Sequence, residues 1–178
     1  ALIADIEFSQ LGRYPQAWQA YNALRTQHSD HFAGDPMNSL RFQMLEEARP
    51  HDYAPLYALH AAGNEPDTAF AQYEQVLAQY PNTLAARVAL EEMVALAGHG
   101  GAAGSAPSAE ALEAVRSRCQ EPIAVAWINQ NLGEAYWHGL DDLGSARECF
   151  LRAQESPDAQ VRQLAEGALA QLAAADAR

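Results

Sequence analysis

The stretch "NLGEAYWHGLDDLGSARECFLRA", residues 131–153, contains two helical patterns joined by a short polar turn. Residues 128–136 place apolar side chains at spacings of three and four, which is typical of one helix face. After the turn, Ala146 and Phe150 begin a second face with the same spacing. Because the connection is short, we expect the two helices to pack antiparallel.

The turn itself carries residues that end one helix and begin the next. Gly139 is expected to take the left-handed conformation that ends the first helix, since glycine has no Cβ to clash there. Asp141, Asp142 or Ser145 is expected to cap the second helix. These signals predict a helical hairpin.

Composition extends the helical expectation to the whole chain. Apolar residues make up 49% of the 178 residues, and no apolar run approaches the length that a membrane helix needs. Alanine and leucine dominate while β-branched residues are scattered, which favours helix. We therefore expect an all-α protein of one domain, without direct membrane insertion.

The charge balance limits the partners. The formal charge of −12 creates a negative field that repels phosphate backbones and anionic lipid, so nucleic acid is not an expected partner. All 11 cationic side chains are arginine. With the alanine bias, the absence of lysine suggests a bacterial gene, and the sequence leaves cytoplasm and periplasm equally open.

The pattern of alanine followed four residues later by an aromatic residue recurs along the chain. It is found at Ala69 and again at Ala17, and a weaker copy begins at Ala111. The intervals of 42 residues from Ala69 to Ala111 and 35 from Ala111 to Ala146 exceed 34 by lengths that fit a longer loop at His99 to Pro107 and one extra turn residue. The chain is therefore expected to repeat a helix pair about every 34 residues.

One interval is larger. Ala17 and Ala69 are 52 residues apart, which leaves room for an additional helix. Residues 36–49 are amphipathic, with Asp35 as a suitable N-cap, Pro36 at the first helical position and Pro50 after the end. We predict an inserted helix there.

At these positions the chain resembles the tetratricopeptide repeat family, whose motif runs W-x2-L-G-x2-Y, then A-x3-F, then P. The match is carried by seven residues of the last copy, in which Asn129 stands where the family often has tryptophan. They are Leu132, Gly133, Tyr136, Ala146, Phe150, Ala153 and Pro157. The long turn resembles Sel-type repeats, and residues 71–90 are similar to repeats of bacterial envelope assembly lipoproteins.

The resemblance implies a right-handed superhelix in which stacked helix pairs share one core and leave a concave surface for binding. The predicted architecture consists of four repeats, one inserted helix and one capping helix. Their ranges are 1–33, 51–83, 84–121 and 122–157 for the repeats, 36–49 for the inserted helix and 158–175 for the capping helix.

No group of residues predicts catalysis, a cofactor or a metal. "HSDH" (28–31) has two histidines three residues apart, but we expect a polar loop there. Adjacent carboxylates such as Glu91 and Glu92 do not share a helix face. "GHGGAAGSAPS" (98–108) lacks the Gly-Lys-Ser/Thr of a phosphate loop. Cys119 and Cys149 are expected to be buried thiols, and a disulfide between them stays open.

The concave surface should be formed by the first helix of each pair. The candidate binding residues are Trp127, Gln130, Asn131, Glu134, Trp137 and His138 in the last repeat and Glu92 in the third. The tryptophans would anchor a partner and the amides would pair with an extended backbone, so Trp137→Ala is expected to abolish binding without unfolding the protein. Alternatively, one or both tryptophans pack against the adjoining repeat.

We therefore expect a non-enzymatic scaffold that binds a neutral or basic protein segment. Relatives that clamp a C-terminal carboxylate use several cations in the groove, and the first helices here offer only Arg87. Two alternatives stay open: a structural section of a longer repeat protein in a bacterial export or envelope complex, and the interaction module of a multidomain enzyme. Because the first residues already lie within a helical pattern, we expect the chain to continue upstream. The sequence does not predict an oligomeric state.

Overall fold

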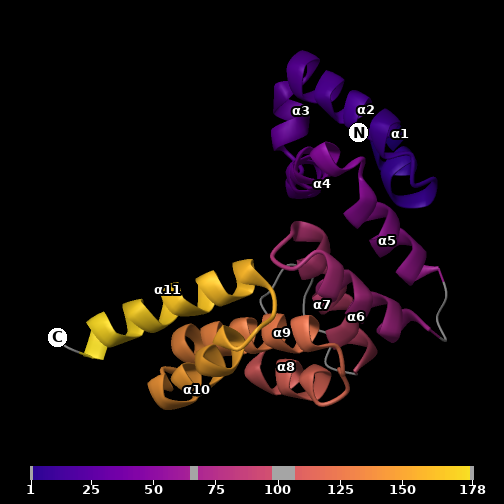
Figure 1. Cartoon of the computed structure of the whole chain (residues 1–178). Coiled ribbons are helices and arrows are strands. Elements are labelled where there is room, and N and C mark those ends of the chain that lie inside the picture. Colours follow the sequence, from indigo (N-terminus) through magenta and orange to yellow (C-terminus); the bar gives the residue numbers. More distant parts are fainter. Residues whose placement is uncertain (1, 65–67, 98–106, 177–178) are drawn as a thin grey trace. The chain divides into compact units, whose positions relative to one another are not determined.

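The computed structural model describes residues 2–64, 68–97 and 107–176, and most of them lie in helices (Figure 1). No strand occurs within those ranges. The expected all-α class is therefore confirmed. The chain divides into two compact units, residues 1–69 and 70–178.

Residues 2–64 of the first unit form five α-helices and two short turns of other helical types. In chain order these are α1 (Leu2–Asp5), the π-helical turn η1 (Ile6–Gln10), α2 (Tyr14–Gln27), α3 (Ser29–Ala33), α4 (Pro36–Ala48), the 3-10 turn η2 (Arg49–His51) and α5 (Ala54–Gly63).

Tyr14 joins the start of α2 to α5. Its side chain is buried, and its hydroxyl donates a hydrogen bond to the Leu56 carbonyl oxygen at 2.8 Å. The ring also packs edge-on against Tyr57, with 4.8 Å between ring centroids. An aromatic residue with a satisfied hydroxyl can be buried without losing a hydrogen bond, so Tyr14 stabilises this contact.

A second polar link connects α1, α2 and α4. Asp5 accepts hydrogen bonds from the buried Tyr21 hydroxyl and from the Arg41 guanidinium. Burial, followed by the hydrogen bond to Asp5, raises the pKa of Tyr21. The carboxylate thus satisfies one donor from α2 and one from α4.

A helix is present at the residues predicted for the inserted helix, where α4 runs from Pro36 to Ala48. Asp35 accepts a hydrogen bond from the backbone N–H of Met37 at 2.9 Å, and Pro36 is the first helical residue. The α-helical pattern ends at Ala48, two residues before Pro50. Both ends lie where proline and the aspartate cap place them.

The prediction of a polar loop at residues 28–31 is wrong. Ser29–Ala33 forms α3, and the rings of His28 and His31 lie 6.3 Å apart. Five residues without an apolar repeat give no periodicity from which a helix could be predicted.

The second unit contains the remaining helices. They are α6 (Ala69–Gln79), α7 (Leu84–Leu96), α8 (Ala109–Arg116), α9 (Pro122–Glu134), the π-helical turn η3 (Ala135–Gly139), α10 (Leu143–Gln154) and α11 (Ala159–Asp176).

The boundary between the units falls inside the predicted second repeat, residues 51–83. Helix α5 belongs to the first unit, and α6 lies almost entirely in the second. Residues 65–67, between these helices, and most of the predicted long loop at 99–107 lie outside the described residues.

Helices α9 and α10 form the predicted hairpin, and they pack closely because Gly133 has no side chain (Figure 1). A Cβ placed on Gly133 would lie 2.7 Å from Cδ1 of Phe150, which is itself fully buried. Glycine is therefore required here by a close approach between helices.

The turn between these helices differs from the expectation. Gly139 does not take the left-handed conformation; it ends the π-helical turn η3, and Asp141 takes a φ of 53° instead. Aspartate tolerates this region better than most side chains. Asp142 caps α10 as predicted, since its carboxylate accepts from the Ser145 N–H at 3.0 Å.

Helix α11 follows α10 and packs against both α10 and α9 (Figure 1). Asp158 precedes it and accepts hydrogen bonds from the N–H groups of Gln160 and Val161. The buried face of α11 includes Ala165, Ala168 and Leu172. The predicted final helix over 158–175 is confirmed.

Candidate binding surface

Helix α9 and its extension η3 carry six of the seven predicted binding residues. Pro122 is the first helical residue, and the backbone N–H groups of Gln120 and Glu121 donate to the Glu74 carboxylate of α6. A carboxylate at a helix N-terminus satisfies free N–H groups and complements the helix dipole. This contact fixes the start of α9 against α6.

Trp127 lies in the interior, with 3% of its surface exposed. The expectation that it presents an exposed ring is therefore wrong, and the packing alternative holds for this residue. Its indole Nε1–H has no hydrogen-bond partner among the described residues. A buried donor without a partner costs stability, so Trp127 contributes through its packing area alone.

Trp137 is half-buried rather than free. Its ring meets Phe150 edge-on at 6.4 Å and packs against the cluster of Ala146, Phe150, Ala168 and Leu172. Its other neighbour is the His138 ring, stacked at 4.5 Å. The ring thus joins η3 to α10 and α11, and its replacement must affect folding.

Gln130 and Glu134 line a cleft of about 530 Å³ between α9 and α11, which we call the amide cleft. Five of its residues carry side-chain amides, each of which can donate through its NH2 group and accept through its oxygen. Its lining consists of Asn82, Gln130, Glu134, Gln160, Gln163, Leu164, Gly167, Ala168 and Gln171.

Gln130 is the buried member of the amide cleft, with 6% exposed. Its Nε2 donates to Glu134 Oε1 at 3.3 Å, while no described residue donates to its Oε1. Buried carbonyl oxygens in native proteins nearly always have a partner, so this one is an unsatisfied acceptor in the wall of the amide cleft.

Glu134 is held from both sides along the helix. Besides the Gln130 amide, His138 Nε2 lies 3.1 Å from Glu134 Oε2. Its side chain is nevertheless 45% exposed. The carboxylate is therefore oriented before any partner arrives and can still be reached by a cation.

Asn131 and His138 face a different depression, which we call the apolar hollow. It has a volume of about 560 Å³ and lies between the start of α8 and the end of the α9–η3 helix. Its lining consists of Pro107, Ser108, Ala109, Leu112, Asn131, Glu134, Ala135, His138, Gly139 and Leu140. Glu134 lines both depressions.

Glu92 lines neither depression. It is exposed on α7, where its charge adds to the burial that raises the pKa of Tyr73. Glu92 is thus not brought together with the other predicted residues.

The glutamines of α11 were missed by sequence reasoning, which treats Gln160 and Gln163 as an ordinary solvated face. Gln160, Gln163 and Gln171 are spaced by 3 and 8 residues, which places them on one side of a helix. That spacing was the available signal, but only the fold shows that α9 lies opposite.

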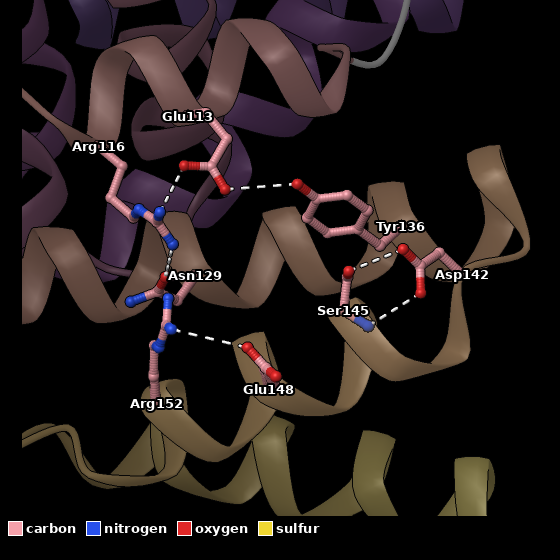
Figure 2. Close-up of polar contacts among 8 residues, drawn as sticks. All are labelled: Glu113, Arg116, Asn129, Tyr136, Asp142, Ser145, Glu148 and Arg152. Carbon is pink, nitrogen blue, oxygen red and sulfur yellow. Dashed lines mark hydrogen bonds and ion pairs between the residues drawn. The ribbon is translucent and has the colours of Figure 1, made fainter.

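Asn129 of α9 belongs to a polar network with residues of α8. The Arg116 guanidinium donates to Oδ1 of the buried Asn129 at 3.1 Å and pairs with Glu113. Figure 2 shows both contacts. The Tyr136 hydroxyl donates to Glu113 at 3.4 Å. The network links α8 to the α9–η3 helix and satisfies its own groups.

The cysteines show no activation. Burial raises the pKa of Cys119 to about 12 and also raises that of Cys149, so both stay protonated thiols. Both are free. Within the described ranges, no three histidine, cysteine or carboxylate side chains come close enough to hold a metal ion.

Comparison with known proteins gives no assignment: no family model, curated protein or solved structure matches the chain. Among the helices in the described ranges, none combines the length and apolar character needed to cross a bilayer.

Proposed function

We propose that the second unit is a non-catalytic binding module of tetratricopeptide-like helix pairs, which holds an extended, neutral or basic protein segment in the amide cleft. The observation that carries this proposal is the buried Gln130, whose Oε1 has no donor within the described structure and which lines that cleft.

The order of the helices supports the repeat architecture. Helices α7 and α8 form one pair, α9 and α10 the next, and α11 takes the place of the first helix of a further pair. In such stacks the first helices line one surface. The amide cleft is lined by the turn before α7 and by α9 and α11, so it lies along these first helices.

Side-chain amides suit an extended backbone. A peptide in this conformation presents alternating N–H and C=O groups, and a glutamine or asparagine can pair with either. Asn82 adds an exposed amide at a residue with a φ of 60°, next to α7. Five amide side chains therefore offer pairing along the segment without demanding one side-chain sequence.

Charge favours cationic partners. Among the residues that the structure describes, Glu134 is the one ionised side chain that lines the amide cleft, and the whole chain carries −12. A negative site attracts basic segments and repels acidic ones, with an effect on association rate that salt weakens.

The test is selection of 12-residue peptides from a random display library on the purified chain, followed by titration of the selected peptides. We expect enrichment of arginine and lysine, and binding weakened about tenfold by the double change Gln163→Ala and Gln171→Ala. The matched control is Gln75→Ala with Gln79→Ala, because both glutamines are exposed on α6 outside the amide cleft. Equal binding by both double variants, or selection of no peptide, would refute the proposal.

A further inference from the structure

The apolar hollow has a wall made mostly of carbon. Pro107, Ala109 and Leu112 line it from the start of α8, and Ala135 and Leu140 line it from the other side. Leu140 is 63% exposed although it borders this depression. A partly exposed leucine beside a concave apolar wall can bury further area when an apolar group enters.

Glu134 connects this hollow to the amide cleft. It is the residue that lines both depressions, and its carboxylate is oriented by Gln130 and His138. A segment lying in the amide cleft therefore reaches the edge of the apolar hollow at an anionic group. This continuity and the charge indicate what can bind there.

We propose that the apolar hollow is a specificity pocket that takes an aliphatic side chain of the bound segment, while a cationic side chain of the same segment pairs with Glu134. This inference rests on the proposed function, because it assumes that a segment occupies the amide cleft. It adds a chemical requirement that the amides alone do not impose.

The spacing of the two side chains follows from strand geometry. Side chains two residues apart on an extended segment point to the same face, whereas neighbours point to opposite faces. Because the hollow borders Glu134, the proposal has both side chains leave the segment on the same face. The favoured pattern is therefore a cation and an aliphatic residue separated by one position.

The experiment uses the full chain, labelled with ¹⁵N, and the peptide acetyl-Gly-Ser-Arg-Ser-Leu-Ser-Gly-amide. We expect shifts in the backbone amide signals of Ala135 and Leu140, at the hollow, and of Gln163, in the amide cleft. Replacing the peptide's leucine by glycine should remove the shifts at the hollow and weaken binding about tenfold. Replacing the peptide's arginine by glutamate should abolish the shifts at the hollow and also those in the amide cleft.

Two protein variants test the same contacts. Glu134→Gln should weaken the arginine peptide several-fold and remove most of the salt dependence, and Leu140→Ser should weaken the leucine peptide without affecting the glycine one. Leu151→Ser is the control, because Leu151 is 49% exposed on α10 and lines neither depression. Circular dichroism verifies that each variant is folded.

The outcomes separate the two proposals. Shifts in the amide cleft with none at the hollow would overturn this inference and leave the proposed function standing. Shifts at neither site would overturn both. If sedimentation shows that the chain self-associates and Leu140→Ser prevents it, the hollow holds a second copy, and the peptide pocket is refuted.

Discussion

The Glu74 carboxylate oxygen Oε1 lies 2.6 Å from the backbone nitrogen of Glu121, a residue 47 positions later. It also accepts from the N–H of Gln120. A side chain of α6 therefore holds the two residues that lead into α9, the helix that carries most of the candidate binding surface.

Glu74→Ala should leave these two N–H groups without their protein acceptor. Hydrogen bonds to a charged group contribute about 1.5–3 kcal/mol each when shielded, and partial exposure reduces this, so we expect a loss of about 1–2 kcal/mol. Urea unfolding measures the loss, and hydrogen exchange should speed up at the Gln120 and Glu121 amides. The neighbouring change Gln75→Ala should cause neither the loss nor the faster exchange. Unchanged exchange in Glu74→Ala would show that Glu74 does not hold these two amides.

Two glycines in helices of the second unit should respond in opposite directions. Gly133→Ala would push a Cβ against the buried Phe150 ring, whereas a Cβ on Gly167 of α11 meets no atom within 4 Å. We expect Gly133→Ala to lower the free energy of unfolding by about 1–2 kcal/mol, because the steric overlap outweighs the better helix propensity of alanine. Gly167→Ala has no such overlap and should raise the free energy of unfolding by about 0.5–1 kcal/mol. Thermal melts of both variants measure the contrast. Equal effects would contradict the close approach at Gly133.

Local signals in the sequence were sufficient for helix class and several boundaries. Asp35 and Pro36 predicted the start of α4, and the cap of α10 is Asp142, one of the three residues expected there, because these residues act on their own neighbouring backbone. The turn conformation was predicted at Gly139 but occurs at Asp141, since η3 extends the helix through the glycine. A π-helical turn has no recognisable pattern in a single sequence.

The binding surface could be predicted only in part. Helical spacing selected Gln130 and Glu134 correctly as neighbours on one face, but it selected Trp127 with them. Which side of α9 is covered depends on where α8, α10 and α11 pack, and those contacts join residues far apart in the chain. For the same reason the sequence did not identify the glutamines of α11, which line the amide cleft because α11 packs beside α9.

Trp137→Ala should destabilise the protein, contrary to the expectation from sequence. The ring packs against the cluster around Phe150 and Leu172, and its removal from a half-buried site should cost about 2 kcal/mol. Thermal unfolding measures this cost. His138→Ala is the control, because the His138 ring is exposed and stacks on the Trp137 ring. We expect this variant to melt near the melting temperature of the parent. An unchanged melt for Trp137→Ala would show that the ring is not part of the core.

Trp127→Phe should have little effect, because the substitution removes an indole N–H that has no acceptor among the described residues. The lost packing and the removed unsatisfied donor offset one another, so the free energy of unfolding should change by less than about 1 kcal/mol. Trp127→Ala should instead cost about 3–5 kcal/mol through its cavity. A large loss in Trp127→Phe would show that the indole N–H has a partner in solution, such as a buried water.

The cap formed by Asp142 should make stability depend on pH. Hydrogen bonds from the Ser145 N–H, and then from its hydroxyl, lower the pKa of Asp142 below its ordinary 3.8. A lowered carboxyl pKa means that the folded state releases the proton more readily than the unfolded state. The stabilisation is therefore complete above about pH 4 and is lost as the pH falls through the folded pKa. Asp142→Ala should melt below the parent at neutral pH, and the gap should close towards about pH 2.

The matched variant is Asp142→Asn, since asparagine is also a good N-cap but does not titrate in this range. Its melting temperature at neutral pH should lie between those of the parent and Asp142→Ala. The gap between Asp142→Asn and Asp142→Ala should not change with pH, whereas the gap between parent and Asp142→Ala should. Melting curves of the three proteins at several pH values measure both gaps. A parent-to-alanine gap that stayed constant down to about pH 2 would mean that the Asp142 charge does not stabilise α10.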